Sequence, residues 1–93
     1  MEIKDIYKLT ATVVQFSSTE YPIIVETKEY MATEAEGLEF LVKQQIGLEQ
    51  VWNNVYLSDE RHTRIHFEIW VMRVVNNVFF KDSRISSNII KNY

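Results

Sequence analysis

The stretch "RIHFEIWVMR", residues 64–73, carries the strongest β-strand pattern in the chain and decides its fold class. One face of this strand is apolar and consists of Ile65, Phe67, Ile69 and Val71. The other face begins with polar residues but ends in Trp70 and Met72, although the solvated side of a half-buried strand is normally polar. The sequence therefore predicts a sheet whose outer face is partly apolar.

Two earlier segments predict a β-hairpin over residues 1–31. "YKLTATVVQF" (7–16) and "IIVETKEYM" (23–31) both alternate and are rich in β-branched residues. The segment "SSTEYP" between them supplies turn residues, and Pro22 belongs at the start of the second strand because it has no N–H.

A helix is predicted over residues 33–47. Thr33 and Glu36 have the spacing of a capping box, in which each side chain binds a free backbone donor at the helix start. Gly47 is the expected end of the helix. The face expected in the core consists of Ala35, Leu38, Leu41, Val42 and Ile46.

The remaining chain predicts strands over residues 50–80, followed by a tail over 81–93. "QVWNNVYLS" (50–58) gives a possible third strand, and Asn76-Asn77 could form a tight turn after the strand at 63–75. The tail could be a short helix, a frayed end or a cover for one of the apolar surfaces.

These elements predict one domain over residues 1–93 of the α+β class. We expect two layers, with one principal helix on a mainly antiparallel sheet of about four strands in the order ββαββ. A β-grasp arrangement would share this order of elements, as would other small α+β folds.

Composition and motifs predict a protein that is not an enzyme and has no cofactor or metal. The 93 residues include no cysteine, so thiolate nucleophiles and cysteine metal sites are excluded, and a cytoplasmic location is the default expectation. No signal peptide or membrane-spanning run is visible. His62 and His66 have a spacing that suits a helix rather than the strand expected there, and no phosphate-binding glycine loop occurs.

Charge is distributed unevenly around the net value of −3. Residues 20–60 contain nine acids and two lysines, whereas residues 61–93 contain six bases and two acids. Opposed charges of this kind favour self-association or a charged partner, although two solvated faces that differ would give the same pattern.

Two apolar surfaces lead us to expect protein partners. The outer sheet face predicts a homo-oligomer interface that comprises Trp70, Met72, Val14 and Phe16. Phe40 is expected opposite the buried face of the helix, beside a glycine that permits close approach. The predicted partner-binding surface comprises Glu34, Glu36, Gly37, Glu39, Phe40 and Gln44.

The hairpin followed by "ATEAEGLEFLVKQQ" (32–45) resembles small phage-encoded proteins that inhibit host enzymes or defence systems by contact alone. The resemblance implies a viral or mobile-element protein that occupies a basic site on a host protein in the host cytoplasm. The alternative function is single-stranded nucleic-acid binding through Arg64, Arg73, Trp70 and the C-terminal bases, because basic and aromatic sheet surfaces stack unpaired bases.

Overall fold

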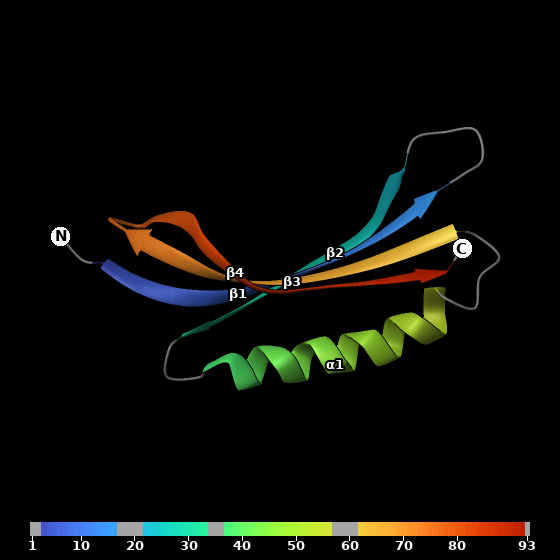
Figure 1. Cartoon of the computed structure of the whole chain (residues 1–93), viewed down its shortest axis with the longest axis horizontal. Coiled ribbons are helices and arrows are strands. Elements are labelled where there is room, and N and C mark those ends of the chain that lie inside the picture. Colours follow the sequence, from blue (N-terminus) through green and yellow to red (C-terminus); the bar gives the residue numbers. More distant parts are fainter. Residues whose placement is uncertain (1–2, 17–21, 34–36, 57–61, 93) are drawn as a thin grey trace.

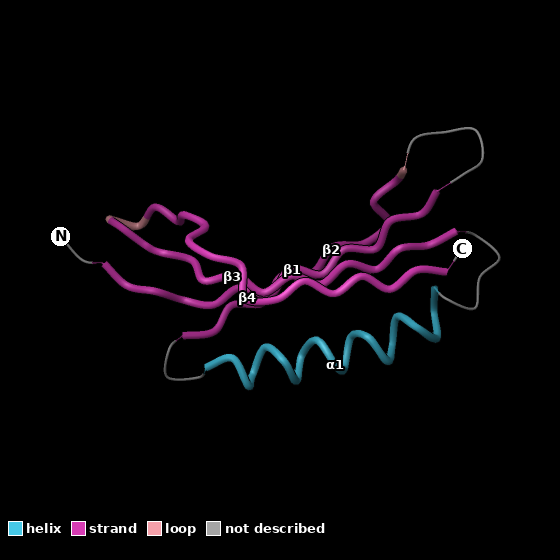
Figure 2. Tube along the Cα trace, viewed as in Figure 1, coloured by secondary structure: helices cyan, strands magenta, loops and turns pink. Residues whose placement is uncertain are grey.

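A computed structural model describes residues 3–16, 22–33, 37–56 and 62–92. Its elements follow in the order β1 (Ile3–Phe16), β2 (Ile23–Thr33), α1 (Gly37–Tyr56), β3 (His62–Val75) and β4 (Val78–Asn92). The four strands form one long, twisted sheet, and α1 lies along one of its faces (Figure 1). The other face is concave along the strands and carries no helix (Figure 2).

The sheet has the order β2-β1-β3-β4, and all its pairs are antiparallel. β2 and β3 therefore run in the same direction on either side of β1, and α1 provides the crossover between them. The α+β class with a four-stranded antiparallel sheet is confirmed, whereas the closer likeness to a β-grasp arrangement is not confirmed.

The core lies between α1 and the two central strands. The predicted apolar face of β3 is confirmed at Ile65, Phe67 and Ile69, which are all buried. Leu9, Ala11 and Val13 of β1 lie beside them in the antiparallel register. This alternation produces one dry face, because successive side chains of a strand point to opposite sides.

The helix differs from the prediction at both ends. It begins at Gly37 rather than after Thr33, which is the last residue of β2. Gly37 has a φ of 73°, a conformation that glycine adopts without the steric cost of a side chain. Gly47 does not end the helix but lies in its middle.

The prediction of a third strand over residues 50–58 is wrong, because α1 continues to Tyr56. Leu41, Leu48 and Trp52 are the buried residues of the helix, and their i, i+7, i+11 spacing is that of one helical face. The indole of Trp52 stacks on Phe67 with ring centroids 6.0 Å apart. The core therefore depends on Trp52, a helical residue in a segment that was predicted to be a strand.

The C-terminal segment forms β4 rather than a helix, a frayed end or a cover folded over the sheet. The predicted Asn76-Asn77 turn is confirmed, and both residues have the positive φ that such a two-residue turn requires, 49° and 67°. The register between β3 and β4 shifts at Ile69/Trp70 and again at Val71/Met72. These two bulges bend the first half of β4 toward the concave face, as Figure 1 shows.

The C-terminal end of α1 is fastened to the edge strand β2 by a hydrogen bond. The Tyr56 hydroxyl donates to Glu26 Oε2 at 2.5 Å. This hydrogen bond, together with burial and the nearby carboxylate charge, raises the pKa of Tyr56 above its ordinary value of 10.0.

We expect Tyr56→Phe to lower the free energy of unfolding by about 1 kcal/mol at neutral pH. Because the folded-state pKa is raised, the stabilisation is complete below pH 10 and is lost as the pH rises through the folded-state value. Urea titrations of both proteins from pH 7 to pH 11 measure this effect. A difference between them that persists unchanged at the alkaline end would contradict the assignment.

Candidate protein-interaction surfaces

The described residues include fourteen large hydrophobic side chains that are exposed, about as many as form the core. They occupy three places: the outer parts of α1, the two ends of β2, and the edge strand β4. These residues are Ile23, Ile24, Val25, Met31, Phe40, Val42, Ile46, Val51, Val55, Val78, Phe79, Phe80, Ile85 and Ile89. Single exposed apolar residues are ordinary, but contiguous groups mark interaction sites.

Helix α1 is apolar on both of its flanks. At about 100° per residue, Val42 and Ile46 lie on one side of the buried stripe, and Phe40, Val51 and Val55 lie on the other. Only a narrow outer arc is polar, and it includes the Glu39–Lys43 ion pair of 3.4 Å. A helix that covers a sheet alone would expose a broad polar face, so this helix is suited to neighbours on both sides.

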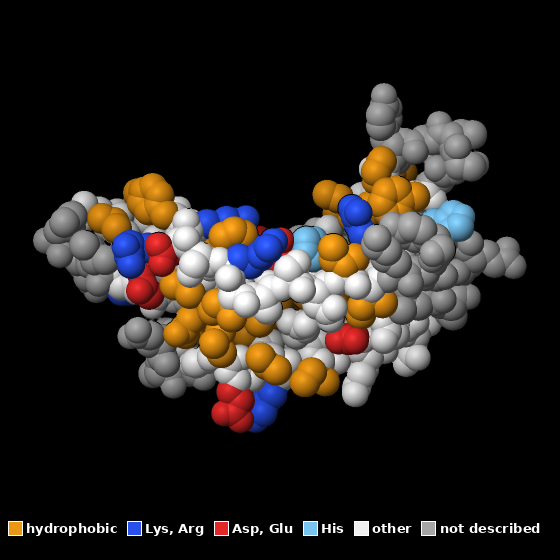
Figure 3. Space-filling view, viewed as in Figure 1, with side chains coloured by type: hydrophobic (Ala, Val, Ile, Leu, Met, Phe, Trp, Pro, Cys, Tyr) orange, Lys and Arg blue, Asp and Glu red, His pale blue; other side chains and the backbone are white. Residues whose placement is uncertain are grey.

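The side of the sheet that carries α1 is only half covered. The helix packs mainly on β2 and β1, less on β3, and makes no close backbone approach to β4 within the described residues. On this side β4 presents Ser86, Asn88 and Ile90, and Ile85 is the extra residue of the bulge next to Ser86. Figure 3 shows hydrophobic side chains gathered between β4 and α1 on the near face.

We call this surface the half-covered patch and define it by Val42 and Ile46 of α1 with Ile85 and Ile90 of β4. Val42, Ile46 and Ile85 are exposed, whereas Ile90 is half-buried and packs against the core. The patch therefore continues the hydrophobic core outward to the surface.

The concave face has a different character, with a carboxylate at its centre. Glu68 accepts a 3.0 Å hydrogen bond from Trp70 Nε1 and lies 3.4 Å from His66 Nε2. Arg84 Nη1 approaches the same carboxylate at 3.9 Å, and Lys8 pairs with Glu29 at 3.1 Å. Most charges on this face are therefore already paired within the chain.

The predicted oligomer interface on the concave face stays a prediction, and two of its residues are largely covered within the chain. Met72 is 5% exposed and Val14 is 9% exposed, so neither offers much surface to a partner. Trp70 is half-buried, and the ammonium group of Lys81 lies 4.7 Å from its ring centroid. The bulged first half of β4 places Lys81 over Trp70 and opposite Met72, so the apolar end of β3 is covered within one chain.

The predicted partner-binding residues do not form one surface. Glu34 and Glu36 lie outside the described residues. Phe40, 36% exposed, and Gln44 share the flank of α1 that also carries Val51 and Val55, whereas Glu39 lies on the polar arc. Gly37 begins the helix.

The most exposed part of the helix differs from the sequence prediction. Val42 and Ile46 are predicted on the buried face and residues 50–58 in a strand, so Val51 and Val55 are not among the predicted surface residues. Continuing the apolar period of Leu41 through Leu48 to Trp52 would have found the full helix and both flanks.

The histidines do not form a recognisable reactive site. His66 Nε2 faces both Ser87 Oγ, at 3.0 Å, and Glu68 Oε1, at 3.4 Å. In a catalytic triad the serine and the acid bind opposite ring nitrogens, so this contact pattern differs from a triad. No group of three potential metal ligands occurs among residues 3–16, 22–33, 37–56 and 62–92.

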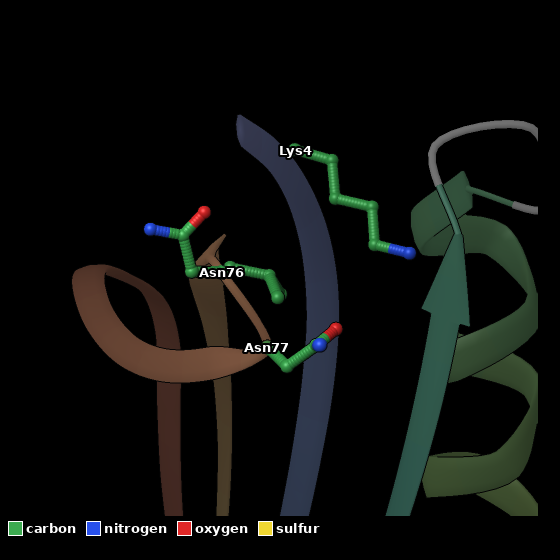
Figure 4. Close-up of a pocket in the computed structure, with 4 residues that line it drawn as sticks. Lys4, Asn76 and Asn77 are labelled. Atoms are coloured by element: carbon green, nitrogen blue, oxygen red, sulfur yellow. The ribbon is translucent and has the colours of Figure 1, made fainter. Parts of the chain in front are cut away.

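A shallow cavity lies at the β3–β4 turn, beside the start of β1. It is lined by Lys4, Val74, Asn76 and Asn77 and has a volume of about 180 Å³ (Figure 4). Figure 4 shows the three polar side chains diverging rather than converging on one point. This arrangement resembles an ordinary gap between a hairpin tip and a neighbouring strand.

Comparison with family models, with curated proteins and with solved structures finds no match. No helix in the described part of the chain is both long and apolar enough to cross a membrane. The surfaces described above are therefore the basis for any functional assignment.

Proposed function

We propose that this chain is a non-enzymatic protein-interaction module that binds another protein through the half-covered patch. The single observation that carries the proposal is the incomplete helix layer: α1 makes no close approach to β4, and, for a right-handed helix placed as in Figure 1, its Val42 and Ile46 flank lies on the β4 side. An amphipathic element of the partner, laid beside α1 and over β4, would complete that layer. This is the helix-in-groove mode of recognition, in which apolar anchors supply the affinity.

A carboxylate on the Val42 flank of α1 favours a partner with a basic residue beside its apolar stripe. Glu49 is one heptad after Val42 and so lies on the same flank, whereas Glu39 on the outer arc is already paired with Lys43. A small protein that inhibits a host enzyme by contact, as the sequence resemblance implies, would act through such a surface.

Site-specific photocrosslinking tests the proposal. A photoreactive phenylalanine analogue is placed at Ile46, and cells that produce the protein are irradiated. We expect one discrete adduct of the 11.1 kDa chain with a different protein, called here the heavy adduct, which mass spectrometry distinguishes from an adduct of two copies.

The matched control places the same analogue at Thr27, an exposed position on the other face of the sheet. The heavy adduct should be absent there and should disappear at position 46 when Ile85 is changed to Glu. No adduct at position 46, or an adduct with a second copy only, would refute the proposed function.

Single-stranded nucleic-acid binding has weaker support from the same structure. Base stacking requires open aromatic faces, and two rings already have a cation over them: Lys81 lies over Trp70, and the Arg64 guanidinium lies 5.2 Å from the centroid of Phe16. Phe79 and Phe80 of β4 are exposed. Arg73 approaches Asp5 at 3.3 Å and Asp82 at 3.9 Å. These basic side chains therefore already contact aromatic rings or carboxylates of the same chain.

A further inference from the structure

The two edges of the sheet differ in how open they are to further strand pairing. β4 has two bulges, which discourage pairing with another strand. β2 has one register shift, at its start near Val25, and pairs regularly from Glu26 to Thr33. Its outer edge is the more suitable of the two for strand addition.

The same edge lies beside the apolar flank of α1 that contains Phe40, Val51 and Val55. Figure 1 views the sheet from the β4 edge, with α1 below it and running from left to right. An α-helix is right-handed. Residues that lie about 90° counter-clockwise from the buried stripe, seen along the axis from the N-terminus, therefore point away from this viewer, past β2. Val51 and Val55, each 57% exposed, occupy that side.

Gly47 lies on this flank, one turn before Val51. A Cβ built on Gly47 would meet nothing within 4 Å, so no contact within the chain requires glycine there. Glycine inside a helix costs about 1 kcal/mol relative to alanine. Close approach of another helix would account for it.

The lateral spacing fits a second copy. Strands are about 4.8 Å apart, so a two-fold axis between β2 and its symmetry mate lies about 2.4 Å outside β2. A helix seated between β2 and β1 lies about 4.8 Å from that axis, which puts the two helices about 9.6 Å apart. Packed helices are typically 8–10 Å apart.

Charge fixes a register for the paired strands. Glu26 and Lys28 lie on the helix side of β2, on either side of Thr27. Antiparallel pairing centred on Thr27 puts Glu26 of each copy opposite Lys28 of the other, and Thr27 opposite itself. Opposite-charge and Thr–Thr pairs both stabilise adjacent strands.

The exposed flank of α1 indicates the same position for the two-fold axis. Helical side chains lean toward the N-terminus, so the Tyr56–Glu26 hydrogen bond sets Glu26 beside helix residues about one turn before Tyr56. Thr27, one strand residue further along, then lies near the level of Val51. Antiparallel helices centred on Val51 put Val55 of one copy against Gly47 of the other, where the open space accepts it.

We infer that the partner of the β2 edge is a second copy of this chain, in a two-fold dimer whose axis passes near Thr27 and Val51. The dimer has a continuous eight-stranded sheet with two antiparallel α1 helices on one face. A contact along the ~30 Å helix and through two layers covers roughly 600 Å² per copy, the lower end of stable interfaces. This dimer is independent of the half-covered patch, which stays open on both copies.

Disulfide trapping tests the register, because the chain contains no cysteine. Thr27→Cys and Val51→Cys, each alone, are expected to give covalent dimers under mild oxidation, since residues related by the axis come within disulfide distance. Ser87→Cys on β4 is the control and should stay monomeric on a non-reducing gel. If Thr27→Cys and Val51→Cys crosslink no faster than Ser87→Cys, the proposal is wrong.

Sedimentation measures the association itself. We expect the wild type to be a dimer and Val51→Glu to raise its dissociation constant at least ~10-fold, because the interface would bury an unpaired charge. Ile46→Glu on the opposite flank, similarly exposed, should leave the dimer intact. A monomeric wild type, or a Val51→Glu dimer of unchanged affinity, overturns the inference, and the circular-dichroism melting curve verifies that each variant is folded.

Discussion

Trp52→Ala is expected to lower the free energy of unfolding by about 3–5 kcal/mol, the cost of removing a large aromatic side chain from a core. The indole is 3% exposed, stacks on Phe67 at 6.0 Å and meets the Tyr56 ring edge-on at 6.3 Å. It is the main contact between the C-terminal half of α1 and β3. Thermal melting at fixed protein concentration should show a fall of at least about 12 °C.

Trp52→Phe provides the comparison, because phenylalanine keeps a ring in place against Phe67. We expect it to recover more than half of the lost stability. Val42→Ala, on the exposed flank of α1 away from the β2 edge, is the surface control and should change the melting temperature little. Equal losses for Trp52→Ala and Val42→Ala would mean that α1 is not packed as described.

The second large effect is expected at Leu9, in the middle of β1. This side chain is fully buried and lies between Tyr30 of β2 and Ile69 of β3 in the register of the sheet. Leu9→Ala leaves a cavity beneath the helix, and we expect a loss of about 3–5 kcal/mol in chemical denaturation.

Thr10→Ala is the matched control for Leu9→Ala. Thr10 is the next residue of the same strand but faces the concave side, opposite Glu29 and Glu68. Its substitution should cost under about 1 kcal/mol. A loss at Thr10 as large as that at Leu9 would show that the two faces of the sheet are not divided into a dry side and a wet side.

The strands were predictable from the sequence because their signal is local. Ile65, Phe67 and Ile69 alternate with polar residues, and Asn76-Asn77 has the turn chemistry that the backbone requires. The end of the helix was not predictable by the same local rule. Glycine is typical of a helix end, but α1 extends beyond Gly47 because Leu48 and Trp52 pack on the sheet.

The candidate surfaces were predictable only in part. The sequence indicated an excess of apolar residues outside the core and the exposure of Phe40. It could not show that Met72 becomes buried beside Lys81, since this pairing depends on register shifts between β3 and β4. Nor could it show the uncovered half of the helix layer, which results from where α1 lies across the strands.

The irregular hydrogen-bond register of β4 has a consequence for how far copies of this chain can assemble. A sheet with two equally receptive borders would add molecules end to end and grow into a fibre. In the dimer inferred above, the β4 border is kinked by two bulges, so addition at the β2 border would give a closed pair and then stop. The same bulges that place Lys81 over Trp70 would therefore also prevent growth into a fibre.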